Sequence, residues 1–240
     1  MFQGRFYRSR VNSGLFKFTV TDGESDIFIS CEGNLEKQAV RIVRKLRNIV
    51  ANYIRKYPEF EKSLVPLKFD KSAPQMIRSM LKSSIAAGVG PMASVAGAIA
   101  EYLGRELLNF TEQIMVENGG DIFLKSHEER IISIYAGDSI LSGKLALKIK
   151  SKDTPLAVCT SSGTVGHSLS FGRADAVTIL AKDGALSDAC ATATCNMIKY
   201  GRDIGPALEF AKNIEGVLGA VVIYRNKIGS IGSVELVRIA

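Results

Sequence analysis

Three short polar segments of this 240-residue chain contain the residue types that phosphate and magnesium sites use. Two are tetrapeptides that follow apolar runs, Asn118-Gly119-Gly120-Asp121 and Thr160-Ser161-Ser162-Gly163. The third, residues 187–193, contains Asp188 and Thr192. Glycine-bearing turns can point backbone N–H groups at an anion, and carboxylate and hydroxyl oxygens are hard ligands that suit Mg²⁺. The segments therefore predict a site for a phosphorylated small molecule.

Asp188 and Thr192 are four residues apart at the start of an expected helix, so they project from the same face of it. This spacing predicts a magnesium site, and the helix N-terminus would favour a bound phosphate. The alternative is structural: Asp188 offsets the helix dipole and Thr192 packs against a neighbour. Spacing alone leaves both interpretations open.

Each tetrapeptide also has a structural alternative. The segment 118–121 could hold an anion and present the Asp121 carboxylate to a ribose or base N–H, or it could be an ordinary hairpin turn. The segment 160–163 could contact phosphate through hydroxyls and amides, or it could be a polar loop. A serine nucleophile is not expected, because the chain has no G-x-S-x-G motif.

His167 is the third candidate catalytic residue, beside Asp188 and Thr192. It lies in an expected loop at residues 166–172 that begins and ends with glycine. The alternative is a surface histidine or one hydrogen bonded within the loop. The cysteines form no C-x-x-C pair, which argues against a zinc site and indicates buried, reduced thiols. They are Cys31, Cys159, Cys190 and Cys195.

The composition indicates a globular, cytoplasmic protein. Hydrophobic residues make up 46 % of the chain and charged residues 23 %, as expected for one domain over residues 1–240 or for two closely packed lobes. The sequence shows no secretory signal and no apolar run of membrane-spanning length, so no membrane association is expected. The net charge of +7 favours anionic ligands, but nucleic acid is not an expected partner because no recognised binding motif is present.

Hydrophobic periodicity predicts a mixture of strands and helices. Strands are expected at 15–20, 26–31, 112–117, 122–125, 131–135, 145–149, 156–160, 176–180, 217–224 and 233–239. Helices are expected at 35–56, 75–87, 92–108, 188–200 and 206–213, with Asn34 and Ser187 as N-caps. The last two strands should form a terminal hairpin, whose apolar positions would permit a homodimer. The pattern predicts an α+β fold with a largely antiparallel sheet and packed helices.

Taken in order, these segments resemble the ApbE-like flavin transferase superfamily (FAD:protein FMN transferases), and most of all a short branch that carries a UPF name. The resemblance covers residues 88–197 and rests on the series of motifs rather than on any one of them. It implies an ApbE-like fold and a site for Mg²⁺ and FAD or a related nucleotide. In the family, the residues that match Asp188 and Thr192 hold the metal with a backbone carbonyl near Pro91. The turns at 118–121 and 160–163 would hold the nucleotide.

The chain also departs from the family pattern. Where the family reads Ala-Lys-Gly-Tyr, this sequence has Gly90-Pro91-Met92-Ala93-Ser94 and no lysine, and the family's Asp-Pro does not follow His167. The first half is shorter as well. Two functions therefore stay open. One is a Mg²⁺-assisted enzyme, transferase-like or pyrophosphatase-like, that processes a flavin-like or nucleotide-like phosphorylated molecule. The other is a catalytically silent flavin- or nucleotide-binding module or sensor.

Overall fold

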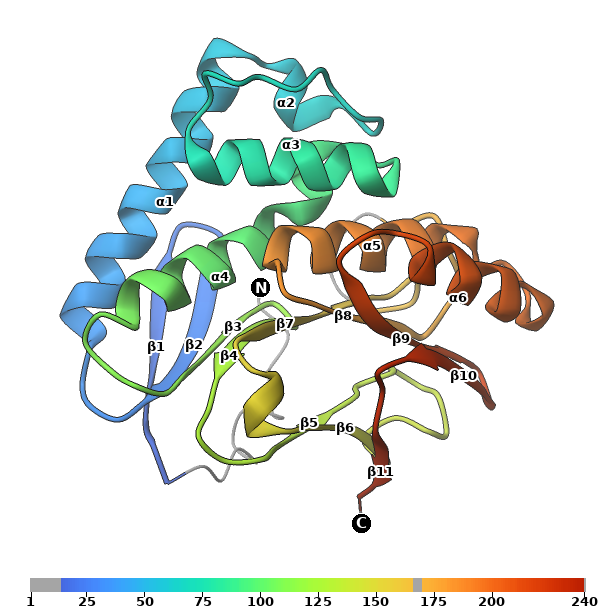
Figure 1. Ribbon diagram of the computed structural model, residues 1–240. Coiled ribbons are helices and arrows are strands. Elements are labelled where there is room, and N and C mark those ends of the chain that lie inside the picture. The colour runs from blue at the N-terminus through green and yellow to red at the C-terminus, as the bar shows by residue number, and fades with distance from the viewer. Residues whose placement is uncertain (1–13, 166–169, 240) are drawn as a thin grey trace.

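A computed structural model describes residues 14–165 and 170–239 of the chain (Figure 1). Its largest element is an eight-stranded sheet with the order β1-β2-β3-β4-β7-β8-β9-β10, in which every neighbouring pair is antiparallel. The strands are β1 (Phe16–Asp22), β2 (Ser25–Cys31), β3 (Ile114–Asn118), β4 (Asp121–Lys125), β7 (Leu156–Ser161), β8 (Ala176–Ala181), β9 (Val217–Tyr224) and β10 (Lys227–Gly232). The expectation of a largely antiparallel sheet is confirmed.

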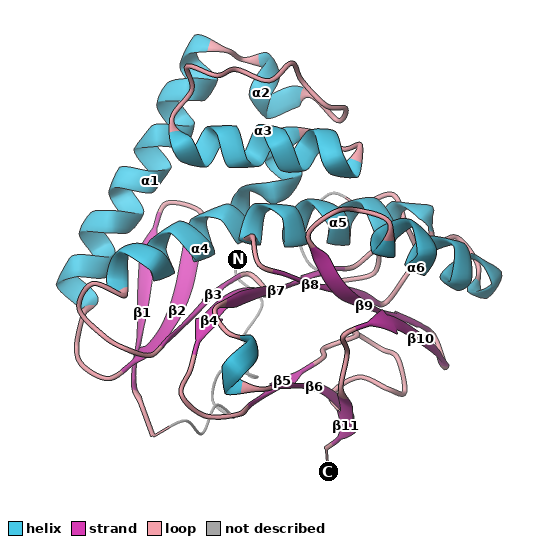
Figure 2. Cartoon of the chain, in the orientation of Figure 1, coloured by secondary structure: helices cyan, strands magenta, loops and turns pink. Residues whose placement is uncertain are grey.

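A smaller antiparallel sheet has the order β11-β6-β5. Its strands are β5 (Arg130–Ser133), β6 (Leu145–Ile149) and β11 (Leu236–Arg238). Figure 2 shows this sheet on the opposite side of the large sheet from the helices. The central strand β8 is buried at all its positions, because side chains on both of its faces are covered.

The helices form two layers over the large sheet (Figure 1). The layer against the sheet consists of α4 (Val95–Leu107), α5 (Gly184–Met197) and α6 (Ile204–Lys212). The outer group is α1 (Glu36–Lys56), α2 (Glu59–Lys62) and α3 (Gln75–Ala87), of which α1 also packs against β1 at the edge of the sheet. A 3₁₀ turn, η2 (Pro91–Ser94), leads into α4, and η3 (Ser151–Asp153) and η4 (Gly201–Asp203) are the other short turns.

The long helix α1 follows its amphipathic pattern. Its buried positions recur at steps of three and four residues and face the core, while its lysines and arginines lie largely on the exposed face. Asn34 was expected to be the N-cap, but the N-cap of α1 is Leu35 and has no side-chain cap bond. The Asn34 carboxamide instead accepts from the N–H of Glu36 at 3.1 Å, one residue before the cap position.

Three groups of buried apolar side chains make up the core. One fills the space among β1–β4 and α1, α3 and α4, and another lies between α5, α6 and the strands β8 and β9. The last lies between the two sheets.

In the described part of the chain, no single helix is long and apolar enough to cross a membrane. The helix α3 and the segment Pro91–Leu107 reach the required length and apolar character only when taken together, and they are bent by 106° relative to each other.

The start of α5 differs from the sequence expectation. The helix begins at Gly184 rather than at residue 188, and its N-cap is Asp183, whose side chain accepts from the N–H of Leu186 at 2.8 Å. The Ser187 hydroxyl does not cap the helix but donates to the Ile179 carbonyl at 2.7 Å. Asp and Ser are similarly good N-caps, so the sequence offered two starts four residues apart.

The C-terminal hairpin differs as well. Strand β9 pairs with β10 through a two-residue turn at Arg225 and Asn226, where Arg225 has a φ of 57°. Residues 233–239 were expected to complete this hairpin, but their strand β11 instead pairs with β6 in the small sheet. Gly229 lies inside β10 rather than in the turn. A Cβ there would approach Ile204 and Leu208, so glycine lets α6 pack closely on this strand.

Candidate functional site

The candidate site is built where the N-terminal ends of α4 and α5 meet above the large sheet (Figure 1). The two helix backbones touch at Gly97 and Gly184. A Cβ on Gly97 would lie 2.2 Å from the Gly184 carbonyl oxygen, and a Cβ on Gly184 would lie 2.4 Å from the Gly97 carbonyl oxygen. Each helix N-terminus carries a partial positive charge, so their meeting point favours negative groups.

Each helix supplies a carboxylate to the other helix's first turn. Asp188 on α5 accepts from the N–H of Gly97 through Oδ2 at 2.9 Å. Glu101 on α4 accepts from the N–H of Gly184 through Oε2 at 2.6 Å. These bonds satisfy helix N–H groups that have no partner within their own helix. Asp188 therefore has a structural role at the N-terminus of α4, whereas the sequence alternative placed that role at the start of its own helix.

The same junction brings the predicted segments 118–121 and 160–163 together. The Asp121 carboxylate accepts from the N–H of Thr160 at 3.2 Å through Oδ1. The Asn118 carboxamide donates to the Ala96 carbonyl in α4 at 3.2 Å. Residues widely separated in the sequence thus meet at the beginning of α4.

Asp121, which is buried, and Asp188, which is partly buried, form an acidic pair. Burial raises the pKa of Asp188 to about 7, against hydrogen bonds from Gly97 and Ala96 that lower it. Burial, and then the neighbouring charge of Asp188, raise the pKa of Asp121 well above its ordinary value. No lysine or arginine of the described chain forms an ion pair with either carboxylate. The pair therefore carries negative charge that only a proton or an added cation would neutralise.

The groups expected to hold a metal lie on two elements that pack against each other, the helix α5 and the turn η2. Asp188 and Thr192 share one face of α5, and the turn η2, which contributes Pro91, packs against that helix. The Pro91 carbonyl already accepts from the Ser94 hydroxyl at 2.6 Å, which leaves its second lone pair. Carboxylate, hydroxyl and carbonyl oxygens suit Mg²⁺, so these residues fit the ion in chemistry. No group of three or more His, Cys, Asp and Glu side chains within residues 14–165 and 170–239 is placed to hold a metal.

The turn at residues 118–121 is a two-residue hairpin, because Asn118 pairs with Asp121 and both glycines have positive φ. The Gly120 N–H donates to the Glu117 carboxylate at 2.9 Å, so this amide already has an anionic partner. A Cβ on Gly120 would meet no atom within 4 Å, although its φ of +110° disfavours other residues. The anion-binding role of this turn stays a prediction.

The segment 160–163 divides into buried and loop-forming parts. Within the described residues, the Ser161 hydroxyl is buried beside the Cys195 thiol and forms no other hydrogen bond. The Ser162 hydroxyl accepts from the N–H groups of Thr164 and Val165 at 3.1 and 3.0 Å, which starts the loop that follows β7. A Cβ on Gly163 would lie 2.2 Å from the Gly172 carbonyl oxygen, so the two ends of this loop pack closely.

Residues 170–172 of this loop are anchored to the end of α5. The Asn196 carboxamide accepts from the N–H of Phe171 at 2.7 Å and contacts the Ser170 hydroxyl at 3.2 Å. A Cβ on Gly172 would lie 1.8 Å from the Cys195 carbonyl oxygen. The candidate catalytic residue His167 lies outside the described residues.

Sequence reasoning missed Gly97 and Glu101 as parts of the site. Their signal was present, because Gly97 precedes Glu101 by four residues and Gly184 precedes Asp188 by the same step. In each helix the glycine and the acid therefore lie on one face, where the glycine allows close approach and the acid reaches the other helix.

The model of the AbpE bacteria family matches residues 8–228. The chain belongs to this family. The UPF0280 protein MJ1526 of Methanocaldococcus jannaschii is 42 % identical to it over 231 residues, 93 % of each chain. A UPF0280 protein of Methanobrevibacter smithii is 37 % identical over 206 residues, which cover 83 % of this chain and 84 % of that relative.

Solved structures share the fold of this AbpE-family chain. The flavinyl transferase ApbE of Pseudomonas stutzeri, in its apo form, aligns with a TM-score of 0.57 at 12 % identity, over 90 % of this chain and 93 % of its own. The flavin transferase ApbE of Vibrio cholerae aligns with a TM-score of 0.57 at 14 % identity, over 91 % and 97 %. The ApbE-like α+β fold expected from the sequence is confirmed.

Proposed function

We propose that this AbpE-family protein binds FAD or a related phosphorylated nucleotide, together with Mg²⁺, where α4 meets α5, and processes its phosphate linkage. The observation that carries the proposal is the acidic pair of buried Asp121 and partly buried Asp188, which has no cation partner in the described chain. A pair of this kind at two converging helix N-termini suits a ligand that brings both a divalent cation and phosphate oxygens.

The substrate class is proposed from the structural neighbours and from the motif series. The Pseudomonas stutzeri and Vibrio cholerae proteins are described as flavin transferases. At 12 and 14 % identity their likeness supports the scaffold, so the flavin enters here as a proposal.

Each proposed binding group has a defined position. Asp188, Thr192 and the Pro91 carbonyl would hold the metal, and Asp121 would share its charge. Bound Mg²⁺ would supply neutralisation of phosphate charge and stabilisation of a leaving phosphate. The turns at 118–121 and 160–163 would hold the nucleotide. His167 stays a candidate proton donor or acceptor.

The second candidate function is binding without turnover. It is favoured by the turn η2, whose side chains are apolar or carry a hydroxyl and include no cation. Because this turn has no lysine, it offers no side-chain cation to stabilise negative charge that develops on a phosphate during cleavage. On this alternative the same groups would retain a flavin or nucleotide as a carrier or sensor.

Calorimetric titration with FAD, FMN, ADP and ATP, each with and without Mg²⁺, tests the proposal, followed by mass spectrometry of the products. We expect Mg²⁺-dependent binding of FAD and release of AMP and FMN. Intact FAD after prolonged incubation would support the silent module instead.

The variant Asp188→Asn sharpens this experiment, because its amide oxygen can still accept from the Gly97 N–H while the charge is removed. The matched control is Asp153→Asn, an exposed aspartate on η3. We expect Asp188→Asn, and not the control, to lose the Mg²⁺ dependence.

A further inference from the structure

A hollow lies beside α3, and its chemistry differs from that of the α4–α5 junction. It has a volume of about 530 Å³ and is bounded by the segment before α3, by α3 and α4, and by the residue that caps α5. Ligand pockets for small molecules commonly span about 300–1,000 Å³, so the hollow is large enough for a nucleotide-sized molecule.

The walls of this hollow carry unpaired positive charge. Lys71, Arg78 and Lys82 line it and are exposed, and within the described chain none of them forms an ion pair. Arg78 and Lys82 are four residues apart on α3, so like charges lie on one helix face. An anion between them would relieve this repulsion.

The carboxylate that lines the hollow is already occupied. Asp183 accepts from the Ser79 hydroxyl at 3.1 Å through Oδ2 and from the Leu186 N–H at 2.8 Å through Oδ1. It is therefore held as the cap of α5 rather than directed at the cations. The hollow keeps a surplus of positive charge.

Two aromatic rings complete the lining. Phe69 is 39 % exposed on the segment before α3, and Tyr102 is partly buried on α4. Exposed aromatic faces stack with heterocyclic bases, and the stacking is worth about 1–3 kcal/mol per base in single-strand binders. Rings beside cations match a ligand that has both an aromatic base and phosphates.

We propose that this hollow is a second binding site, which takes a nucleoside phosphate without a metal ion. The phosphates would contact Arg78 and Lys82, with Lys71 beside them, and the base would stack on Phe69 or Tyr102. Neither ring nor cation belongs to the α4–α5 junction, so the two sites can be tested separately.

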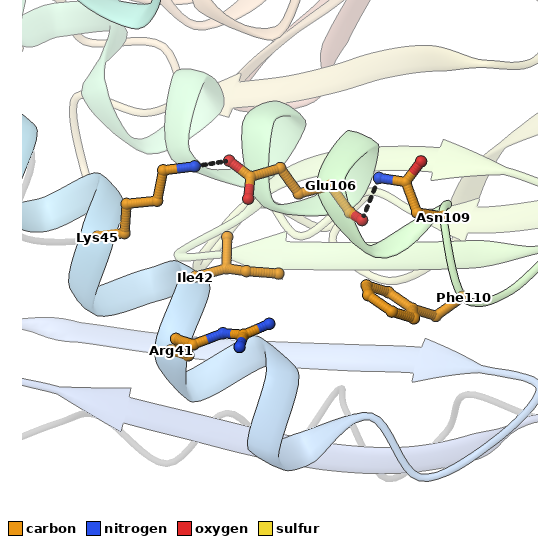
Figure 3. Close-up of a pocket in the computed structure, with 6 residues that line it drawn as sticks. All are labelled: Arg41, Ile42, Lys45, Glu106, Asn109 and Phe110. Carbon is orange, nitrogen blue, oxygen red and sulfur yellow. Dashed lines mark hydrogen bonds and ion pairs between the residues drawn. The ribbon is translucent and has the colours of Figure 1, made fainter.

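A smaller hollow between α1 and α4 serves as a comparison for the charge of the hollow beside α3 (Figure 3). That space is about 310 Å³, and two of its polar groups already bond to Glu106. Lys45 pairs with the Glu106 carboxylate at 2.9 Å, and Asn109 donates to the Glu106 carbonyl at 3.0 Å. Its lysine is thus compensated, which leaves Arg41 as the uncompensated cation there, whereas three uncompensated cations of the described chain line the hollow beside α3.

The test is calorimetric titration of the full chain with ADP in the presence of a chelator, at an ionic strength of about 0.15 M that screens nonspecific attraction. We expect saturable binding that Arg78→Ala/Lys82→Ala weakens at least tenfold. The control Lys37→Ala/Arg55→Ala removes the same charge from exposed positions of α1 and should change affinity less than twofold. Asp188→Asn should leave this binding unchanged.

Phe69→Ala distinguishes a nucleoside phosphate from phosphate alone. It should weaken ADP several-fold and leave inorganic pyrophosphate unaffected, and thermal melting of each variant checks that the fold is retained. The proposal is overturned if ADP does not bind without metal, or if the α3 and α1 double variants lose affinity equally. It is also overturned if pyrophosphate binds as tightly as ADP, or if single-stranded RNA binds through Arg78 and Lys82 while ADP does not.

Discussion

At the scale of single residues, Asp188 divides its role between structure and chemistry. Its carboxylate accepts from the N–H of Gly97 through Oδ2 and is also hydrogen bonded by the N–H of Ala96, and it lies beside the Asp121 carboxylate. The sequence could predict that Asp188 and Thr192 share a helix face. It could not predict that Asp121 lies beside them, because that contact depends on how β4 packs under α5.

This division predicts different effects for two substitutions of Asp188. Asp188→Ala removes the acceptor for an α4 N–H group and should lower the free energy of unfolding by about 1 kcal/mol, as loss of a helix cap does. Asp188→Asn keeps an acceptor and removes a charge that the fold disfavours, so it should not lower the free energy of unfolding. Chemical denaturation measures both, and an equal loss in the two variants would contradict the capping role.

Asp121→Asn should stabilise the metal-free protein at pH 8. The raised pKa values mean that the fold disfavours the ionised acids, so stability falls as the pH rises from the ordinary aspartate range near 3.8 towards about 7, the pKa of Asp188. The amide removes one charge and can still accept from Thr160. We expect a gain on the order of 1 kcal/mol and a flatter pH profile of the melting temperature. A less stable variant with an unchanged profile would show that the carboxylates do not repel.

At the scale of elements, the crossing of α4 and α5 depends on two glycines. Gly97→Ala would place a Cβ 2.2 Å from the Gly184 carbonyl oxygen, so the helices would have to separate. We expect it to lower the free energy of unfolding by about 1–3 kcal/mol, the usual range for overpacking. Denaturant unfolding measures the change.

The matched control is Gly205→Ala in α6. A Cβ there meets no atom within 4 Å, and the position is exposed. Replacing this helical glycine should stabilise the protein by about 0.5–1 kcal/mol. Equal effects of the two substitutions would contradict the close approach at Gly97.

Most elements could be predicted from hydrophobic periodicity, and the errors have physical reasons. The start of α5 was misplaced because Asp183 and Ser187 are both good caps. The four-residue α2 was missed because it is too short to show a period. The partner of residues 233–239 was wrong because strand pairing across the chain is a tertiary property.

At the scale of the whole molecule, one sheet connects all the buried apolar groups. Strands β4 and β7–β9 contribute to the core between the sheets, and the same large sheet contacts every helix of its covering layer. We therefore propose that residues 1–240 form a single domain. Thermal unfolding followed by far-UV and tyrosine near-UV circular dichroism should give one coincident transition, and two separated transitions would indicate independent lobes.

The predicted homodimer would form through the exposed edge strand β10 of the large sheet. In the described chain β10 pairs on one side only, and its residue Ile228 is 40 % exposed. An edge strand of this kind can pair with a second copy. Light scattering during size-exclusion chromatography checks it, with twice the chain's 26.0 kDa expected for a dimer and 26.0 kDa contradicting it.

The central claim is that the acidic pair of Asp121 and Asp188, where α4 meets α5, binds a flavin nucleotide through a divalent cation. The most direct measurement is calorimetric titration of FAD with and without Mg²⁺, on the natural chain and on Asp188→Asn in parallel. We predict that Mg²⁺ strengthens FAD binding at least tenfold in the natural chain and has no effect in the variant. Equal FAD affinity with and without Mg²⁺ in the natural chain, or an unchanged Mg²⁺ effect in Asp188→Asn, would contradict it.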